Sequence, residues 1–251
     1  IYLQENQGWE FGFISAWKQL KHGNNLIGMP HSTVRYWDLR YFFDPRLFEL
    51  NNKCNLPLPN KVGVNGPVAK KAYINGGYSK ADLFEVEALR YLNAGNFKTY
   101  NNSELLSGNK IAILVLGDSL QENTIRQMQL LEKASEQFSA KIKCIVKPHP
   151  SCTILEDDFP LLDMSVTNKP IDQLFDKCMI AYTSSVTSAA VDAYCAGKLI
   201  ITMLDPKILN LSPLRGYTKI RFVSTSQEMV DAINYFDLSE KIFSHDEDFF
   251  F

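Results

Sequence analysis

Short apolar runs alternate with amphipathic segments along most of the chain. Runs typical of buried strands lie at 1–4, 25–29, 61–64, 82–86, 110–116, 142–146, 179–182, 199–203 and 221–223. Between them, helical periodicity and helix-starting or helix-ending residues predict helices at 9–20, 68–75, 122–138, 171–175, 185–196 and 226–235. The first of these helices has one apolar face, formed by Trp9, Phe13, Ala16, Trp17 and Leu20. Strands that alternate with helices are typical of an α/β fold with parallel sheets.

A segment rich in Asn, Gly and Ser at 93–108 contains few large aliphatic residues and predicts a domain boundary. We therefore expect a first α/β domain at 1–95, a second at 105–238 and a C-terminal tail at 239–251, both domains being of Rossmann type. The chain begins within a strand and has no initiator Met. We expect the first domain to be incomplete and the chain to be part of a longer protein.

Composition narrows the class of protein. The formal net charge of -2 argues against nucleic acid as the main partner. No apolar run is long enough to span a bilayer, and no signal peptide is visible. The five cysteines form no CxxC pair and the four histidines are scattered, so we expect buried, reduced thiols and no zinc site. This fits a cytoplasmic protein, with peripheral contact to the inner face of the membrane left open.

Three polar motifs follow predicted strands: Gly117-Asp118-Ser119, Lys147-Pro148-His149-Pro150 and Thr183-Ser184-Ser185. In open parallel sheets, ligands bind beyond the carboxyl ends of the strands. The third motif opens a predicted helix and belongs to a segment, 183–188, with five hydroxyl groups. Free backbone N–H groups and the helix dipole favour an anion at such a place. The alternative is an ordinary helix cap, which Ser and Thr supply routinely.

The motif at 147–150 presents an ammonium and an imidazole at the end of a strand. Its two prolines fix the backbone around His149 and disfavour both helix and strand. A histidine there could donate to a phosphate oxygen, or donate a proton to a leaving group near neutral pH. The alternative is a rigid turn with an exposed histidine.

These paired motifs resemble the nucleotide-binding domain of bacterial sialyltransferase-like glycosyltransferases of the GT-B type. A narrower resemblance, to surface-carbohydrate proteins associated with nonulosonic-acid pathways, is carried by the segments 5–10, 30–32, 86–91, 210–216 and 221–223. His-Pro followed by Ser/Thr also resembles the glycerophosphotransferases of teichoic-acid synthesis and the Kdo transferases of capsule synthesis. The resemblance implies a GT-B-like fold and nucleotide or phosphate contacts from Gly117, Asp118, Lys147, His149, Pro150, Thr183, Ser184 and Ser185.

The implied reaction is an inverting transfer of a sugar, such as a sialic-acid-like nonulosonate, from a CMP-activated donor to a glycan acceptor. We expect no cofactor besides the donor. The chain has no GxGxxG and no Walker A sequence, and its D-x-D pattern at Asp246-Glu247-Asp248 lies in the tail with no strand before it. We therefore expect a metal-independent reaction.

One departure concerns the catalytic base. Sialyltransferases of this type carry two acidic residues followed by glycine, whereas Glu156-Asp157-Asp158 has no glycine after it and lies elsewhere. The base must then come from the first region, where the candidates are Glu5, Glu10 and His31. Each could equally be structural, and Glu10 could be a partner of the helix dipole.

Two further questions stay open in the sequence. Arg35 and Arg40 could bind a sugar carboxylate, or could be solvated charges. The chain could also be a transferase for CDP-glycerol or Kdo, or a non-catalytic nucleotide-binding or scaffold module of polysaccharide assembly.

Overall fold

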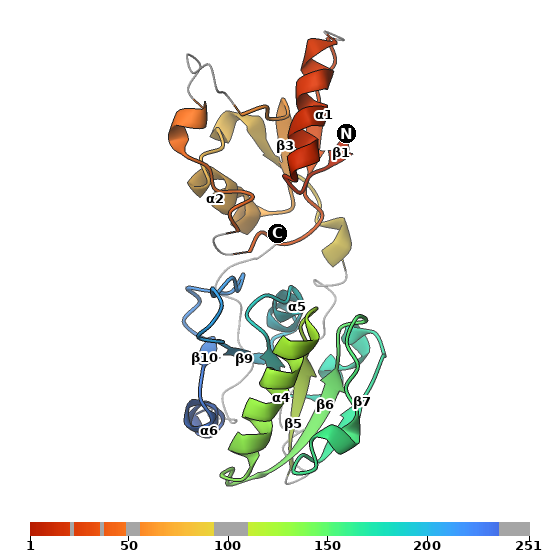
Figure 1. Cartoon of the computed structure of the whole chain (residues 1–251), viewed down its shortest axis with the longest axis vertical. Coiled ribbons are helices and arrows are strands. Elements are labelled where there is room, and N and C mark those ends of the chain that lie inside the picture. The colour runs from red at the N-terminus through yellow and green to blue at the C-terminus, as the bar shows by residue number, and fades with distance from the viewer. Residues whose placement is uncertain (21–22, 36–37, 49–55, 93–109, 236–251) are drawn as a thin grey trace. The chain divides into compact units, whose positions relative to one another are not determined.

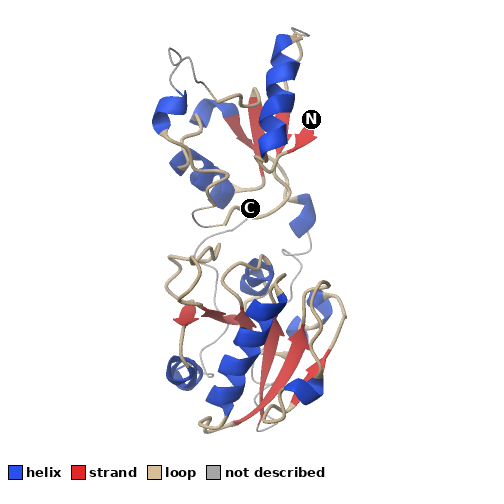
Figure 2. Ribbon diagram, viewed as in Figure 1, coloured by secondary structure: helices blue, strands red, loops and turns tan. Residues whose placement is uncertain are grey.

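The structure, a computed structural model, describes residues 1–20, 23–35, 38–48, 56–92 and 110–235. They form two compact units, residues 1–92 (unit 1) and residues 110–235 (unit 2), each with one parallel sheet and its own helices (Figures 1 and 2). The predicted α/β class with two parallel sheets is confirmed. The segment predicted as the boundary, 93–108, and the tail at 239–251 lie outside the described residues.

Unit 1 contains a four-stranded sheet with the order β1-β2-β3-β4, in which all the pairings are parallel. The strands are β1 (Tyr2–Leu3), β2 (Ile27–Met29), β3 (Lys61–Val64) and β4 (Leu83–Glu85). The helices are α1 (Gly8–Gln19) and α2 (Pro67–Asn75), with 3-10 turns at Pro45–Phe48, Lys80–Asp82 and Leu89–Tyr91. Pro67 suits the first position of α2, because that position needs no N–H donor and proline presets the helical φ angle.

Helix α1 turns a different face to the protein than its apolar pattern suggests. Its buried residues are Glu10 and Ile14, whereas Trp9 is 67% exposed and Leu20 is 62% exposed. Part of the apolar face is used locally, since Phe13 packs against Tyr2 with ring centroids 5.7 Å apart. Periodicity predicted the helix and its aromatic residues. The side chain that is buried in its first turn, however, is the carboxylate of Glu10 rather than an aromatic ring.

Unit 2 contains a six-stranded sheet with the order β10-β9-β8-β5-β6-β7, again with parallel pairings throughout. The strands are β5 (Lys110–Leu116), β6 (Lys141–Lys147), β7 (Met164–Val166), β8 (Ile180–Thr183), β9 (Leu199–Met203) and β10 (Arg221–Val223). The helices are α4 (Gln121–Ser135), α5 (Ala189–Cys195) and α6 (Ser226–Tyr235), with 3-10 turns at Glu156–Asp158, Ile171–Gln173 and Phe175–Lys177. Numbered within the unit, the strand order is that of a Rossmann sheet, 3-2-1-4-5-6.

Three of the predictions for unit 2 differ from the structure. The helix expected at 171–175 is replaced by the two 3-10 turns at Ile171–Gln173 and Phe175–Lys177. Strand β7 was not expected, because its three residues are only half-buried and show no apolar run. Helix α5 begins at Ala189 instead of Ser185, so the hydroxyl-rich segment 184–188 is a loop. Gly197, with φ of +68°, ends that helix as predicted, since glycine adopts this left-handed conformation without strain.

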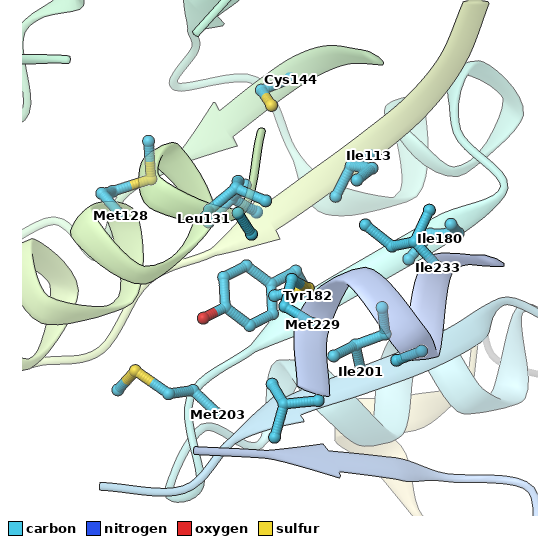
Figure 3. Packing of buried hydrophobic residues seen from close by; sticks show 14 of the residues in the cluster. Ile113, Met128, Leu131, Cys144, Ile180, Tyr182, Ile201, Met203, Met229 and Ile233 are labelled. Carbon is cyan, nitrogen blue, oxygen red and sulfur yellow. The ribbon is translucent and has the colours of Figure 1, made fainter. Parts of the chain in front are cut away.

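The core of unit 2 lies between the sheet and the helices α4 and α6 (Figure 3). Tyr182 is fully buried there among Ile113, Leu131 and Met229, and its hydroxyl donates to the backbone carbonyl of Gln127 at 3.2 Å. Helix α5 packs against β8 and β9, and its buried residues do not belong to this cluster. The sheet therefore carries helices on both faces, as the Rossmann arrangement requires.

Among the described residues, none of the helices is long and apolar enough to cross a membrane. Of the cysteines that the structure describes, Cys144, Cys152 and Cys178 are buried and Cys195 is half-buried, all as free thiols. Burial raises the pKa of the Cys144 thiol to about 12. The fifth, Cys54, lies outside the described residues.

We predict that Gly76→Ala destabilises unit 1. A β-carbon at this position would lie 2.0 Å from the carbonyl oxygen of Tyr41, so the backbone would have to move. We expect the free energy of unfolding to fall by about 1–3 kcal/mol, as for other overpacked sites. All three tryptophans precede residue 92, so tryptophan fluorescence during urea denaturation reports on unit 1.

The matched control is Gly12→Ala, in the middle of α1, where a β-carbon meets no atom within 4 Å. Replacing an exposed helical glycine by alanine should raise the free energy of unfolding by about 0.5–1 kcal/mol. Equal urea midpoints for Gly76→Ala and Gly12→Ala would contradict the prediction, because the backbone at Gly76 would then accept a β-carbon without loss of stability.

Candidate functional site

The polar motifs of unit 2 all lie at the carboxyl edge of its sheet. Strand β5 pairs with β6 on one side and with β8 on the other, so that Leu116 lies opposite both Lys147 and Thr183. The chain leaves β5 toward one half of the sheet and returns at β8 to build the other half. Ligands of open parallel sheets bind at this reversal of strand order. The loops after β5, β6 and β8 therefore form the candidate site of unit 2.

The loop after β5 is compact and rigid. A β-carbon on Gly117 would lie 3.2 Å from the Thr124 side chain and 3.3 Å from the Pro148 α-carbon, so glycine lets two loops approach each other. Asp118 is 1% exposed, and its Oδ1 accepts from the N–H of Leu120 at 2.9 Å. Its Oδ2 is buried and has no hydrogen-bond partner among the described residues.

The chemistry of Asp118 differs from a simple phosphate contact. A carboxylate repels a phosphate, so the backbone N–H groups that open α4, rather than this side chain, suit an anion. A buried carboxylate oxygen without a donor instead suits a hydroxyl group of a ligand. The structure thus places Asp118 at the predicted site while favouring a different kind of contact.

The loop after β6 is joined to the loop after β5 by several hydrogen bonds. The thiol of Cys152 donates to the carbonyl of Asp118 at 3.2 Å, and the side chain of Gln121 exchanges two hydrogen bonds, of 2.6 and 2.9 Å, with the backbone of Thr153. The hydroxyl of Ser151 donates to the carbonyl of Ser119 at 2.8 Å. These contacts hold the two loops as one body.

His149 is exposed at the tip of this body, while Pro148 is buried beneath it and Pro150 is exposed. Its Nδ1 contacts the hydroxyl of Ser151 at 2.7 Å, which leaves Nε2 as the ring nitrogen available to a ligand. The half-buried Lys147 makes no ion pair with any described residue. The edge therefore carries an imidazole and an ammonium that can contact an anion.

The first three hydroxyl residues of the segment after β8 are buried. Thr183 is fully buried, and its hydroxyl is hydrogen-bonded to that of Thr202 on β9 at 3.0 Å. Ser184 and Ser185 are each 2% exposed. The backbone N–H groups of Ser185, Thr187 and Ser188 donate to none of the residues that the structure describes.

Consecutive N–H groups without acceptors form an anion-binding concavity. The candidate phosphate donors of this loop are therefore the main-chain N–H groups of Ser185, Thr187 and Ser188, together with the hydroxyls of Ser184 and Ser185. Thr183 supports the loop through its bond to the neighbouring strand. Helix α5 begins only after this segment, so the ordinary helix-cap alternative does not describe Ser184 or Ser185.

Helix α4 adds two residues that the sequence analysis did not single out. The side chain of Gln127 is buried and donates to the carbonyls of Leu116 at 3.3 Å and Tyr182 at 3.0 Å, tying β5 to β8 beneath the site. Arg126 is paired with Asp205 after β9. A hydrogen bond from the Lys207 N–H and the Arg126 guanidinium lower the pKa of Asp205. Both roles depend on partners far away in the sequence, so no local pattern could reveal them.

Unit 1 brings two of the three candidate bases together. Glu5 follows β1 and His31 follows β2, and the parallel register that pairs Leu3 with Met29 continues to place them opposite each other. The His31 Nδ1 lies 3.7 Å from the Glu5 Oε1, and the two side chains are 42% and 39% exposed. A histidine beside a carboxylate, open to solvent, is an arrangement that can accept a proton from a hydroxyl group.

Glu10, the third candidate, has a different environment. It is 1% exposed, and its carboxylate accepts hydrogen bonds from the backbone N–H groups of Glu5, Asn6 and Gln7 at 3.0–3.2 Å. These contacts satisfy N–H groups at the start of α1 and place a negative charge at the positive end of the helix. Glu10 thus fits the helix-dipole alternative and shapes the loop that carries Glu5.

A buried polar network holds this loop from the other side. Asn6 adopts a left-handed conformation with φ of +55°, and its amide donates to Tyr78 at 2.8 Å and to the Arg40 carbonyl at 2.9 Å. Gln4 donates to the Asn6 Oδ1 at 2.9 Å and accepts from Tyr73 at 3.3 Å. A strained backbone that is fixed by several buried bonds is typical of a functional loop.

The remaining charged candidates are distributed as follows. Arg40 forms a two-pronged pair with Asp38, with bonds of 2.6 and 3.0 Å, so its guanidinium fork is occupied. Burial alone would raise the pKa of Asp38, but the bonds from Arg40 outweigh it and lower that pKa. Arg35 is half-buried. The carboxylate of Glu156 accepts from the backbone N–H of Val166 in β7, and that of Asp158 from the N–H of Leu155. The segment Asp246-Glu247-Asp248 lies outside the described residues.

Within the described residues, no three His, Cys, Asp or Glu side chains converge as metal ligands. No known protein family matches the sequence, and no curated protein does.

Solved structures, in contrast, match the fold over most of the chain. Among them are HepE from Anabaena in complex with UDP (TM-score 0.51, 13% identity) and the UDP-GlcNAc 2-epimerase of Methanocaldococcus jannaschii with UDP-GlcNAc and UDP (TM-score 0.53, 12% identity). MurG from Acinetobacter baumannii matches with a TM-score of 0.56 at 10% identity.

These matches cover 88%, 93% and 90% of this chain, and 65%, 75% and 61% of the three structures, respectively. At such low identity the likeness shows the fold alone. The chain has the GT-B type of fold, with two Rossmann-like units, and spans less than two thirds of the length of HepE or MurG.

We predict that Glu10→Ala destabilises unit 1 by about 2–4 kcal/mol, because three backbone N–H groups lose their acceptor and a helix start loses its cap. Tryptophan fluorescence in urea measures the loss. Glu87→Ala, which removes an exposed carboxylate of the same unit, should change stability by less than about 0.5 kcal/mol. If Glu10→Ala behaved like this control, the capping role would be wrong.

Proposed function

We propose that the chain is the catalytic part of a glycosyltransferase that uses a nucleotide-activated sugar. Unit 2 binds the donor through the loops after β5, β6 and β8. The observation that carries the proposal is the set of backbone N–H groups of Ser185, Thr187 and Ser188, which have no acceptor among the described residues and follow β8 at the same sheet edge as Lys147 and His149. N–H groups, an ammonium and an imidazole are the donors that bind phosphate oxygens and stabilise a leaving nucleotide.

The solved structures of similar fold bear on which nucleotide the donor carries. HepE and the 2-epimerase are solved with UDP or UDP-GlcNAc, which favours a uridine nucleotide over the CMP-linked donor that the sequence resemblance implies. A UDP-sugar has two phosphates to hold, and the site offers two N–H-rich elements, the start of α4 and the loop after β8. We therefore propose a UDP-linked donor and retain CMP- and CDP-linked donors as the alternatives to be tested with it.

In unit 1, we propose His31 as the general base that deprotonates the acceptor hydroxyl, with Glu5 orienting the ring and stabilising its charged form. This assignment rests on their 3.7 Å separation and shared exposure. Glu10 and Asn6 then fix the backbone of Glu5 rather than take part in proton transfer. The glycan acceptor, and a role in bacterial surface-carbohydrate synthesis, remain implications of the sequence resemblance.

A non-catalytic nucleotide-binding module is the competing class of function. It would use the same loops of unit 2 and leave the pair of His31 and Glu5 without a chemical task. Turnover of a bound donor therefore discriminates between the two classes.

We predict that Lys147→Ala and His149→Ala each weaken nucleotide binding by about 10- to 100-fold, the effect of losing a hydrogen bond to a charged group. Calorimetric titration with UDP, CMP and CDP measures the affinities and identifies the preferred nucleotide. Lys143→Ala is the matched control, because it removes an exposed lysine four residues earlier on the same strand. Unchanged affinity in both test variants would remove this loop from the site.

We predict that His31→Ala lowers the rate of nucleotide release from the donor by about 10²- to 10⁴-fold, the usual contribution of a general base. Donor affinity should stay the same, because the donor contacts lie in unit 2. Glu5→Gln should cause a smaller loss, and Glu87→Gln, at an exposed position of unit 1, should cause none. A His31→Ala protein with the full rate would exclude this base, and wild-type protein that binds nucleotide but never releases it from any donor would favour the non-catalytic module.

A further inference from the structure

The side chain of Asn123, in the first turn of α4, is buried but has no hydrogen-bond partner among the described residues. It is 8% exposed. The other buried polar side chains of the same helix are bonded, Thr124 to the backbone of Asp118 and Gln127 to two strand carbonyls. Neither polar atom of Asn123 is fully enclosed, in contrast to the Gln127 Oε1. Buried amides are nearly always bonded to protein or water, so one that is unbonded and still reachable can take a ligand.

The bonds of Gln127 fix where Asn123 lies. The two residues are four positions apart and therefore share a face of the helix. Gln127 donates to the carbonyls of Leu116 in β5 and Tyr182 in β8. Helix α4 begins at the carboxyl edge of the sheet, so the step back to Asn123 leads about 6 Å toward that edge, the length of about two strand residues. Asn123 thus lies level with the loops that follow β5 and β8.

The amide of Asn123 lies beside backbone N–H groups that have no acceptor. The N–H groups of residues 121–123 open α4, no side chain caps them, and they donate to none of the residues that the structure describes. Side chains of a helix lean toward its N-terminus, so the Asn123 amide is directed into the same space. Its face of α4 crosses from β5 to β8, whose following loop carries the other free N–H groups. The two sets of N–H donors are therefore joined by one amide.

Arg126, three residues after Asn123, adds a cation on a neighbouring position of the helix. Its guanidinium is paired with Asp205, which follows β9. The Arg126 side chain is 40% exposed and that of Asp205 is 6% exposed, so the guanidinium forms the outer part of the pair. Its other described contact is with the exposed Glu122, at 3.8 Å, and the rest of its five N–H groups donate to none of the described residues. Arg126 can therefore bind an anion while Asp205 holds it in place.

We propose that Asn123 is a further ligand-contact residue of unit 2, whose amide NH2 donates to a diphosphate bound between the start of α4 and the loop after β8, with Arg126 beside it. Two sets of N–H groups with an amide between them can hold two linked phosphates, whereas the single phosphate of a CMP-linked donor would leave one set without a partner. The site therefore selects a nucleoside-diphosphate-linked donor. This role rests on the proposed function, in which unit 2 binds a nucleotide-activated sugar.

Asn123→Asp separates binding from stability. Aspartate has nearly the size of asparagine, but its carboxylate cannot donate to a phosphate and repels it. In the first turn of a helix, in contrast, an added carboxylate favours folding. Calorimetric titration should show that UDP binds at least about 10-fold more weakly. The urea midpoint, followed by circular dichroism because all three tryptophans precede residue 92, should stay the same or rise.

The matched control is Gln129→Glu, which adds the same charge at an exposed position of α4 and should leave the affinity for UDP unchanged. Asn123→Ala, which removes the amide without adding charge, should weaken UDP binding by about 10-fold. Wild-type protein should bind UDP more tightly than UMP, and Arg126→Ala should reduce this preference by about 10-fold, because UMP lacks the second phosphate.

Equal affinity for UDP in the wild type and both Asn123 variants would overturn the role of Asn123 and leave the proposed nucleotide site in place. A loss of affinity in Asn123→Asp that is accompanied by a lower urea midpoint would also overturn it, since the effect would then be structural. Equal affinity of the wild type for UDP and UMP would contradict the diphosphate class.

Inorganic pyrophosphate, used as a second probe, distinguishes this role from the proposed function. If pyrophosphate binds and Asn123→Asp weakens it, while none of the nucleotides binds, the diphosphate contact stands and the nucleotide donor does not. If neither UDP nor pyrophosphate binds to the wild-type protein, both are wrong.

Discussion

The pairing of β5 with β8 is the interaction on which the candidate site depends. These strands are separated by more than sixty residues of sequence, yet their hydrogen bonds place Leu116 beside Thr183 at the centre of the sheet. Gln127 strengthens the junction by donating to a carbonyl of each strand from the helix above them. Because both strands point the same way, the loops that follow them open at one edge. The candidate phosphate-binding groups meet there as a result of strand order.

The polar residues at this edge of the sheet are of two kinds: some are bonded within the protein, and others have no described partner. Thr183 is bonded to Thr202, and one oxygen of Asp118 accepts from Leu120, so these groups hold the loops in place. The N–H groups of Ser185, Thr187 and Ser188, the Lys147 ammonium and the Nε2 of His149 have no partner among the described residues. A loop that satisfied every polar group internally would be rigid but inert, and one that satisfied none would not keep its shape. The site combines both kinds of group within a few residues.

In unit 1, two glutamates close together in the sequence have different surroundings. Glu5 and Glu10 lie five positions apart, but Glu10 is buried by three backbone donors and Glu5 is open beside His31. The buried carboxylate completes the start of a helix, and the exposed one can assist proton transfer. The left-handed Asn6 between them lets the chain turn from strand to helix while its side chain stays in the buried network.

The sequence by itself determined the α/β class and the place of most elements. Strands such as 61–64, 110–116 and 199–203 were predicted with the observed bounds, because an unbroken apolar run is a local signal that tertiary packing reinforces. It also located the three strand-end motifs, since parallel strands imply a common edge. The prediction of elements failed where several possible helix starts lay together, and where a strand had no apolar run. The five hydroxyl residues at 183–188 could each start a helix, so the true start at Ala189 was missed, and β7 had no apolar run to mark it.

Only the tertiary structure decided which groups are free to act. Trp9 and Leu20 are exposed whereas Glu10 and Ile14 are buried, and periodicity does not say which side of a helix finds a partner. The pairing of Glu5 with His31 follows from the register of β1 and β2, and the hydroxyl of Ser151 is bonded to a carbonyl 32 residues away. Hydrogen-bond partners distant in sequence determine whether a polar side chain supports the structure or remains available to a ligand.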